Sequence, residues 1–469
     1  MQQLRRRIVT GAACLAALAS VMGGSAQTPG PAGRSAGGAP GGTAVEALAG
    51  SLPDGSHYRV VRPARWNGTL VLDLDFVNDP SAPPSAIEQW MVAGGYAIGG
   101  ISREPVAYRF PQAVDDLLAV RTMFIDRWGG TPTRTLSLGN SRGAFVSRIA
   151  LERHPDIFVG ALMSAGGGAG EVALHNAKLD ALWTLKQFSE VPLTVAGFGS
   201  REEAGAEGGR IQQAVRTLQA TPLGRARLAL AAAFEQLPMW ADGDQPPGEG
   251  DVEARLDQLA IGFTAGHPAV VRYNIEQTAG GVFSWNNGVD YAELLSRSQL
   301  LPLVTALYRK AGGDLEADLR ILAGAPRISA SPDAVALVER TMSYAGTIAS
   351  PVFVVDNVGD PFDVEAFDRA YEGAVTAAGR GDLLRTTWVR SSRHSTQSPL
   401  ERLAGFTVLV ERLDTGRWPD ISPDAMNARA ARIRQASTLD LGPARFMASE
   451  APNILRPWDG RHWGTYRAR

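Results

Sequence analysis

The sequence predicts an α/β fold in which a mostly parallel sheet carries helices on both faces. Three observations support this fold class. Short apolar segments alternate with amphipathic helical ones through the first third of the chain, as strand-helix-strand units do. Further strand-like segments return near the C-terminus, after a long and mainly helical stretch. In addition, a glycine-flanked serine stands at a junction between a strand-like and a helix-like segment.

Each element is placed by the period of its apolar residues. The expected strands cover residues 57–61, 69–72, 97–101, 135–138, 159–163, 351–355 and 384–389. The expected helices of the same unit cover residues 86–93, 113–127 and 144–154, with another starting near Pro399 and the last at 406–413. The run at 351–355 is apolar and mostly β-branched, which is typical of a strand buried on both faces.

The N-terminus carries a targeting signal. Arg5, Arg6 and Arg7 precede an apolar stretch and the small residues that end at Ala26, which is the pattern of a secretory signal peptide over residues 1–26. We therefore expect a secreted or periplasmic protein with no membrane span after signal removal. Cys14 is the only cysteine and lies within this signal, so the mature fold must be held by its core rather than by disulfides.

The remaining chain divides into a linker, a core and an insertion. Residues 27–44 are rich in Gly, Pro, Ala and Ser, which predicts a flexible linker. Residues 45–169 and 350–469 form the expected α/β core with a C-terminal tail, whose Trp418, Trp458 and Trp463 we expect to pack against it. Residues 170–349 are the expected cap insertion, mainly helical, to which we assign access control and substrate choice.

Composition excludes several classes of function. The formal net charge is -2 and no dense run of Lys or Arg follows the signal, so we expect no nucleic-acid partner. The glycines at 166–170 do not fit a dinucleotide-binding loop, because the third glycine of that motif would fall on Glu171. The sequence has no H-E-x-x-H motif and no paired cysteines, so neither a catalytic metal nor a cofactor is expected. It predicts no particular oligomeric state.

The serine at the strand-to-helix junction is the candidate nucleophile. Residues Gly139 to Gly143 read G-x-S-x-G around Ser141, between the strand at 135–138 and the helix at 144–154. Such a turn holds its serine in a strained conformation, and flanking glycines avoid collisions with the strand and the helix. The alternative is an ordinary structural turn, but the context on both sides favours catalysis.

A nucleophilic serine needs a base, and His394 is the best placed histidine. It stands in the polar loop after the strand at 384–389 and before the helix near Pro399, where an imidazole at the end of a late strand is expected. The alternative is a loop histidine that faces water.

The base in turn needs an orienting acid. Asp360 follows the strand at 351–355 within a turn-rich loop, and a loop of this length lets a carboxylate reach the histidine. Asp356 and Asp363 compete with it, since either can instead cap the helix that begins near Val364.

The chain resembles the α/β-hydrolase superfamily. The order Ser141, Asp360, His394 is the order of nucleophile, acid and base in that superfamily. Within it, residues 66–72, 95–98 and 153–155 make the chain most similar to secreted bacterial serine esterases with a large cap.

The resemblance also implies an oxyanion hole. In such relatives a His-Gly pair follows the strand that matches 69–72, but this chain has residues 73–77 instead. Because backbone N–H groups need no particular side chain, we expect Phe76 or Val77 to supply one donor and Arg142 the other. A carboxylate at Asp75 disfavours an oxyanion, so we expect it to pair with Arg142; the alternative is that Asp75 faces solvent.

These observations together predict a secreted serine hydrolase that cleaves carboxylic esters, either small molecules or polymers, through an acyl-enzyme. An amidase or peptidase with the same three residues is the nearest alternative, and a non-catalytic binding protein is another. The aromatic segment at 280–291 is expected either to line an acyl pocket or to form a packed hinge of the cap.

Overall fold

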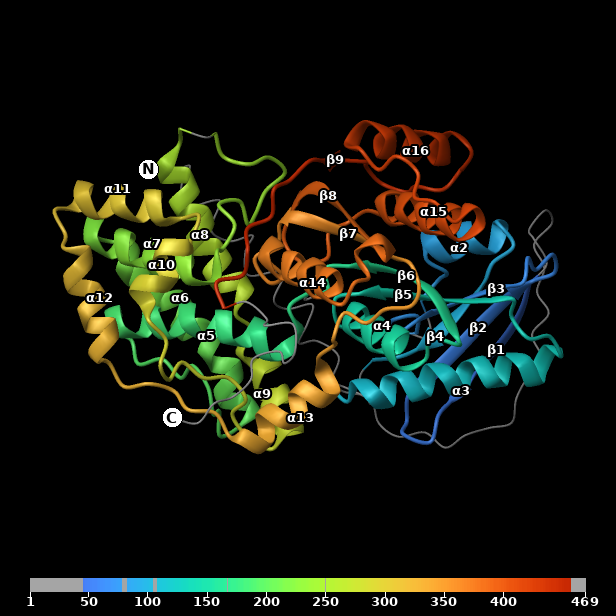
Figure 1. Ribbon diagram of the computed structural model, residues 1–469, viewed down its shortest axis with the longest axis horizontal. Helices are drawn as coiled ribbons and strands as arrows, with labels where there is room; N and C mark the ends of the chain where they lie inside the picture. Colours follow the sequence, from blue (N-terminus) through green and yellow to red (C-terminus); the bar gives the residue numbers. More distant parts are fainter. Residues whose placement is uncertain (1–44, 78–81, 104–107, 167, 249, 457–469) are drawn as a thin grey trace. The chain divides into compact units, whose positions relative to one another are not determined.

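A nine-stranded sheet organises the part of the chain that the computed structural model describes, residues 45–77, 82–103, 108–166, 168–248 and 250–456 (Figure 1). The expected signal peptide and linker, Trp458 and Trp463 lie outside these residues. The strands are β1 (Val45–Ser51), β2 (His57–Pro63), β3 (Thr69–Asp73), β4 (Ala97–Ile101), β5 (Arg134–Asn140), β6 (Phe158–Ser164), β7 (Val352–Gly359), β8 (Leu384–Ser392) and β9 (Phe446–Met447).

The sheet is mostly parallel, as the sequence predicts. Its order is β1-β2-β4-β3-β5-β6-β7-β8-β9, and the neighbours from β4 to β8 all pair in parallel. The pairs β1/β2, β2/β4 and β8/β9 are antiparallel. The carboxyl ends of β3, β5, β7 and β8 therefore meet at one edge, which is where ligands bind in open α/β sheets.

Helices cover both faces of this sheet. In β3, Leu70 and Leu72 join one core cluster and Val71 joins the other, so the strand is buried on both sides as its apolar run predicts. Helices α3 (Phe110–Trp128), α4 (Arg142–Arg153) and α14 (Glu365–Ala377) contribute to the first cluster. Helices α2 (Ala86–Ala93), α15 (Pro399–Thr415) and α16 (Pro423–Gln435) contribute to the second (Figure 1).

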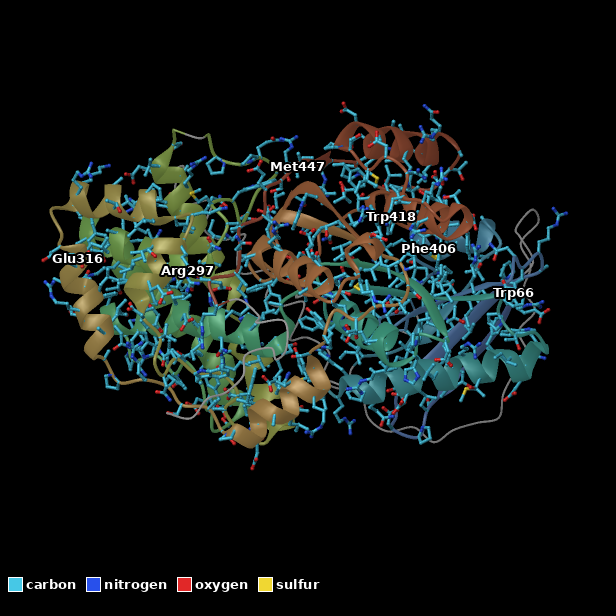
Figure 2. The ribbon with its side chains drawn as sticks, viewed as in Figure 1. Trp66, Arg297, Glu316, Phe406, Trp418 and Met447 are labelled. Atoms are coloured by element: carbon cyan, nitrogen blue, oxygen red, sulfur yellow. The ribbon has the colours of Figure 1, made fainter. Side chains whose placement is uncertain are left out.

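The C-terminal region contains one more helix than expected. The expected final helix at 406–413 is part of the longer α15, and α16 follows it. Met426, Ala430 and Ile433 of α16 are buried at helical spacing, a weak signal among three arginines. Trp418 packs 6.0 Å from the ring of Phe353, on the side of the sheet that also holds Phe406 (Figure 2).

Between β6 and β7 the chain is helical. The helices are α5 (Gly170–Phe188), α6 (Arg201–Gln219), α7 (Pro222–Glu235), α8 (Val252–Gly266), α9 (Ala269–Ala279), α10 (Tyr291–Arg297), α11 (Leu301–Ala311), α12 (Leu315–Gly324) and α13 (Pro332–Met342). We call residues 170–342 the helical region. A short 3-10 helix, η2 (Gly381–Leu383), precedes β8.

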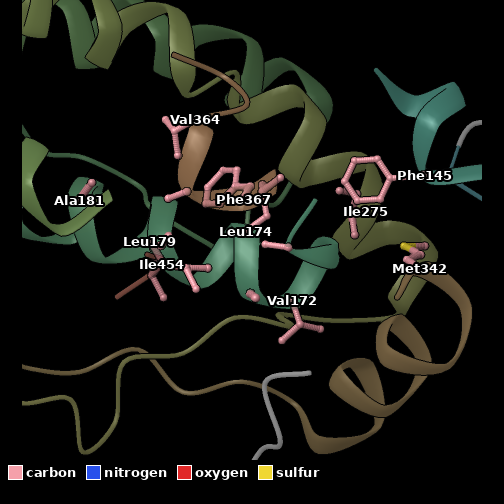
Figure 3. Packing of buried hydrophobic residues seen from close by; sticks show 14 of the residues in the cluster. Phe145, Val172, Leu174, Leu179, Ala181, Ile275, Met342, Val364, Phe367 and Ile454 are labelled. Atoms are coloured by element: carbon pink, nitrogen blue, oxygen red, sulfur yellow. The ribbon is translucent and has the colours of Figure 1, made fainter. Parts of the chain in front are cut away.

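The helical region shares its core with the α/β unit. Phe367 of α14 lies beside Leu174 of α5, and both belong to one buried cluster (Figure 3). The aromatic segment is buried as well: the Tyr291 ring stacks on Trp183 at 5.0 Å and its hydroxyl donates to Asp180. These contacts favour the packing role for that segment.

None of the helices in the described ranges is both long and apolar enough to span a bilayer.

Candidate active site

Ser141 stands at a sharp turn between β5 and α4, and we call this turn, residues 139–143, the elbow. The backbone of Ser141 has φ 54° and ψ −122°, a conformation that non-glycine residues seldom adopt. The Ser141 N–H donates to the carbonyl oxygen of Ser164 at 2.9 Å. A Cβ on Gly139 would lie 2.3 Å from the Gly143 oxygen, whereas one on Gly143 would meet ordinary contacts at 3.6 Å. Only the first glycine is therefore required by close packing.

The structure brings His394 to this serine. The distance between Ser141 Oγ and His394 Nε2 is 2.8 Å. The ring belongs to the loop after β8, and its neighbours Arg393 and Ser395 both have positive φ, 69° and 59°. The backbone is thus left-handed on both sides of His394, whose imidazole faces the elbow.

Side-chain amides hold the histidine loop in place. Asn357 Nδ2 donates to the Arg393 oxygen at 2.7 Å and to Thr396 Oγ1 at 3.0 Å. Asn140 Nδ2, next to the elbow, donates to Ser395 Oγ at 3.0 Å. The loop is therefore tied to both β5 and β7.

Asp360 lies on the other side of the imidazole. Its Oδ2 is 2.7 Å from His394 Nδ1, and its Oδ1 accepts the N–H groups of Phe362 and Asp363 at 2.8 and 3.0 Å. The carboxyl side chain is fully buried. An ionised carboxylate only accepts, so Nδ1 carries the proton and Nε2 accepts from the serine hydroxyl. This is the bonding needed for general-base activation of a serine.

The two competing aspartates lie elsewhere. Asp356 belongs to β7, which extends to Gly359, so the expected loop begins later than the sequence indicates. Its Oδ1 accepts from Gln397 Nε2 at 3.1 Å. Asp356 and Asp363 instead join Asp368 of α14 in a carboxylate cluster.

This carboxylate cluster (Asp356, Asp363 and Asp368) is buried behind Asp360. One oxygen from each of the three lies within 4.8 Å of the others. Two unit charges at that distance repel by about 3.5 kcal/mol at an effective dielectric of about 20. Burial, and then the charges of Asp368 and Asp363, raise the pKa of Asp356 well above its usual range. A hydrogen bond between the side chains of Asp356 and Asp368 contributes to this shift.

The oxyanion side of the elbow differs from expectation. Leu74 and Asp75 are the residues that adjoin Gly143, while the Val77 N–H donates to the Ile101 oxygen at 3.4 Å. The Phe76 ring lies under the Arg59 guanidinium, 4.7 Å from its carbon. Arg142 opens α4, and the N–H groups of a first turn have no acceptor within their own helix.

Asp75 pairs with Arg103, an arginine that the sequence analysis does not name, and the expected pairing with Arg142 stays a prediction. The Arg103 guanidinium donates through Nε and Nη2 to both oxygens of Asp75, and Arg142 lies over the Tyr108 ring at 4.2 Å. Arg103 follows β4, the parallel neighbour of β3, so the two strand ends bring it to Asp75. The parallel pairing of β3 and β4 could have predicted that Arg103 lies near Asp75, but the sequence analysis does not name this arginine.

Nearby, Asp73 adds a second acid at the end of β3. Burial, and then the charge of Asp75, raise the pKa of Asp73 from 3.8 to about 6, against the charges of Arg402 and Arg103. The Asp73 Oδ1 accepts the Asp75 N–H at 3.0 Å. The local charge beside the elbow is thereby close to balanced.

Phe362 joins the site to the helical region. Its ring centre is 4.7 Å from that of His394, and Lys178 Nζ of α5 lies 4.7 Å above the same ring. A cavity of about 20 Å³, room for about one water molecule, lies between Phe362 and helices α5, α6 and α9.

Comparisons with known proteins give one relative in sequence and several similar solved structures. No family model matches the sequence. The chain is 31% identical over 442 residues to o-phthalyl amidase of Xanthobacter agilis, covering 87% of this chain and 96% of that protein. Among solved structures, an esterase from Aspergillus oryzae is similar with a TM-score of 0.40 and 10% identity, over 80% of each chain. Feruloyl esterase B from Aspergillus oryzae is similar with a TM-score of 0.36 and 13% identity, over 80% of this chain and 81% of its own.

The relative is similar over almost its whole length, and the sheet, the elbow and the order of Ser141, Asp360 and His394 fit the same fold. The chain has an α/β-hydrolase fold and belongs to the family of o-phthalyl amidase.

Proposed function

We propose that the chain is a secreted serine hydrolase that cleaves carboxylic esters through an acyl-enzyme on Ser141. The observation that carries this proposal is the hydrogen-bonded series from Ser141 Oγ through the His394 imidazole to the buried Asp360 carboxylate. The export part of the proposal rests on residues 1–26, and N-terminal sequencing of the mature protein tests it.

The chemistry follows from the order of these groups. His394 Nε2 takes the hydroxyl proton as Ser141 Oγ attacks the acyl carbon, and Asp360 stabilises the resulting imidazolium. The N–H of Arg142 and one from residues 73–77, of which Phe76 suits better than Val77, stabilise the oxyanion. When the tetrahedral intermediate collapses, the imidazolium gives its proton to the leaving alkoxide. A water molecule, deprotonated by His394, then attacks the acyl carbon and releases the acid.

A second candidate is hydrolysis of aromatic amides. It is favoured by one observation, that the 31% identical relative is named an o-phthalyl amidase. The same three side chains serve both reactions, because an imidazolium protonates a leaving amine as it does an alkoxide.

Matched substrates distinguish the two. Phthalyl and benzoyl acyl groups are each presented as an ester and as an anilide of the same leaving-group size, and kcat/KM is measured for all four. Ester cleavage faster than anilide cleavage supports the first proposal, and preferred cleavage of the phthalyl anilide supports the second. Binding without product release from any of them supports a non-catalytic protein. In each assay Ser141→Ala is the control.

The helical region is proposed to act as the cap. Two contacts support this role. Lys178 of α5 contacts Phe362 beside His394. Ser392 Oγ, two residues before that histidine, donates to the Gly243 oxygen at 2.8 Å.

A further inference from the structure

A buried cation, Arg148, is a direct partner of the carboxylate cluster behind Asp360. Arg148 of α4 has a fully buried side chain, and its Nη2 donates to Asp368 Oδ1 at 3.3 Å. Its Nη1 donates to the carbonyl oxygen of Gly166. The guanidinium carbon lies 4.5 Å from the centre of the Tyr371 ring and 5.4 Å from that of Tyr344.

These contacts join three segments that the reaction needs. Arg148 is seven residues after Ser141 on the elbow helix, Gly166 follows β6, and Asp368 lies on the helix that follows the Asp360 loop. The chain is closely packed where the segment after β6 meets α14, because a Cβ on Gly168 would lie 2.4 Å from the Phe367 oxygen. Arg148 therefore links the helix that follows the nucleophile to the helix that follows the acid.

Arg148 also sets the charge behind the imidazole. Asp360 and the three members of the cluster place four carboxyl groups behind the imidazole, and Arg148 places one positive charge against them. The other titratable groups that face the cluster are the neutral phenols Tyr344 and Tyr371, Glu365 and Glu372 of α14, and His394. Without Arg148, one more uncompensated negative charge would face His394.

We propose that Arg148 is a positioning residue of this active site, which joins the elbow helix to the acid-bearing segment and limits the negative charge behind the Asp360–His394 pair. The proposal rests on the proposed function, since it concerns the same reaction. It assigns Arg148 no contact with substrate.

Three variants separate the two roles of Arg148, the bridge between the elbow helix and Asp368 and the positive charge behind the imidazole. Arg148→Met removes both, so kcat should fall by roughly 10-fold to 100-fold with little change in KM, and the acidic limb of the kcat/KM profile should move up by roughly one pH unit. Arg148→Lys keeps the charge, so the acidic limb should stay in the wild-type position while kcat recovers in part.

The double variant Arg148→Met/Asp368→Leu removes one charge of each sign and replaces a buried ion pair by apolar groups, a change that folded proteins often accept. It keeps the test decisive where Arg148→Met alone does not fold. The acidic limb should return to the wild-type position, while kcat stays low because the bridge is absent.

The measurement is the pH dependence of kcat and KM on the ester that the wild type cleaves best, with folding checked by circular dichroism. Wild-type kcat and an unmoved acidic limb in folded Arg148→Met, or wild-type kcat in the double variant, would overturn the proposal. Loss of wild-type activity after dialysis against a chelator would also overturn it, because a cation would then balance the cluster. A wild type that cleaves no ester or amide refutes the proposed function instead.

Discussion

Asp75 is a carboxylate beside the proposed oxyanion site, and Arg103 balances its charge. Both oxygens of Asp75 accept from that guanidinium, and Asp75 Oδ2 adjoins Gly143 of the elbow. Loss of the arginine would leave an uncompensated charge next to the oxyanion, where Coulomb repulsion is costly.

We therefore expect Arg103→Met to lower kcat/KM by roughly 30-fold, about 2 kcal/mol of transition-state stabilisation. Asp75→Asn in the same chain should restore most of it, since the repulsive charge is then gone. Steady-state kinetics of the two single variants and the double variant test this. An equal loss in Arg103→Met and in the double variant would mean that the arginine acts by packing rather than by charge.

Asp73 makes stability depend on pH. Its pKa is raised from 3.8 to about 6 by burial and by Asp75, so between these values the folded state binds more protons than the unfolded state. The free energy of unfolding then falls as pH rises through that window. Asp73→Asn removes this loss. The free energy of unfolding of the variant, relative to that of the wild type, should therefore rise by on the order of 2 kcal/mol between pH 4 and pH 7. Urea unfolding at both pH values measures it, and a constant difference would refute the raised pKa.

At the residue scale, the sequence predicts the three side chains that the structure brings into hydrogen-bonding distance, Ser141, Asp360 and His394. Their signals are local, since each follows a recognisable strand. It does not predict the arginine partners of Asp75 and Asp368. Arg103 and Arg148 resemble solvent-facing arginines in the sequence, and only strand order and helix packing bring them to their carboxylate partners.

At the scale of elements, the turn between β5 and α4 depends on one glycine more than on the other. A Cβ at Gly139 would lie 2.3 Å from the Gly143 oxygen and 2.5 Å from Ser147 Oγ, whereas one at Gly143 has only contacts at 3.6 Å.

Gly139→Ala should therefore lower the free energy of unfolding by roughly 1–3 kcal/mol, the usual effect of overpacking. Gly143→Ala is the matched control and should leave stability close to the wild type. Thermal or urea unfolding of the two variants tests this difference. Equal losses would show that the elbow relaxes around either methyl group.

The helices and strands near the site are predicted because their apolar periods are strong. Strands β1 and β9 and helix α16 are not. β1 is mostly exposed and is held by antiparallel pairing with β2, while β9 is two residues long. The exposed residues of β1 follow no clear period, and β9 is too short to have one and pairs with the distant β8.

At the scale of the whole molecule, a buried ion network ties the helical region together. Lys178 Nζ of α5 donates to Glu235 Oε1 of α7 at 3.0 Å and to the Gly266 oxygen at 2.8 Å. His267 Nε2 lies 2.7 Å from Glu235 Oε2. The charges of His267 and Lys178 outweigh burial and lower the pKa of Glu235.

Glu235→Gln should lower the free energy of unfolding by roughly 3–5 kcal/mol, because it leaves Lys178 buried without its counter-charge. Asp242→Asn is the control: its pair with Arg393 is exposed, at 40% and 54%, and should contribute little. Urea unfolding at neutral pH compares them. A similar small effect in both variants would show that Lys178 deprotonates or finds water.

The sequence of the insertion predicts that it is helical, but it does not predict how its helices pack. The sequence places it over the serine by resemblance alone. The contacts of Phe362 with Lys178, and of α14 with α5, join segments almost two hundred residues apart, and no local pattern encodes them.

The central claim, that Ser141 is a nucleophile activated by His394 and Asp360, is tested most directly by reaction with a fluorophosphonate probe. Peptide mass spectrometry should find one modified residue, Ser141, with none in Ser141→Ala and labelling slowed by roughly 100-fold or more in His394→Ala. An unreactive Ser141 in the folded wild type, or labelling that is independent of His394, would contradict the account.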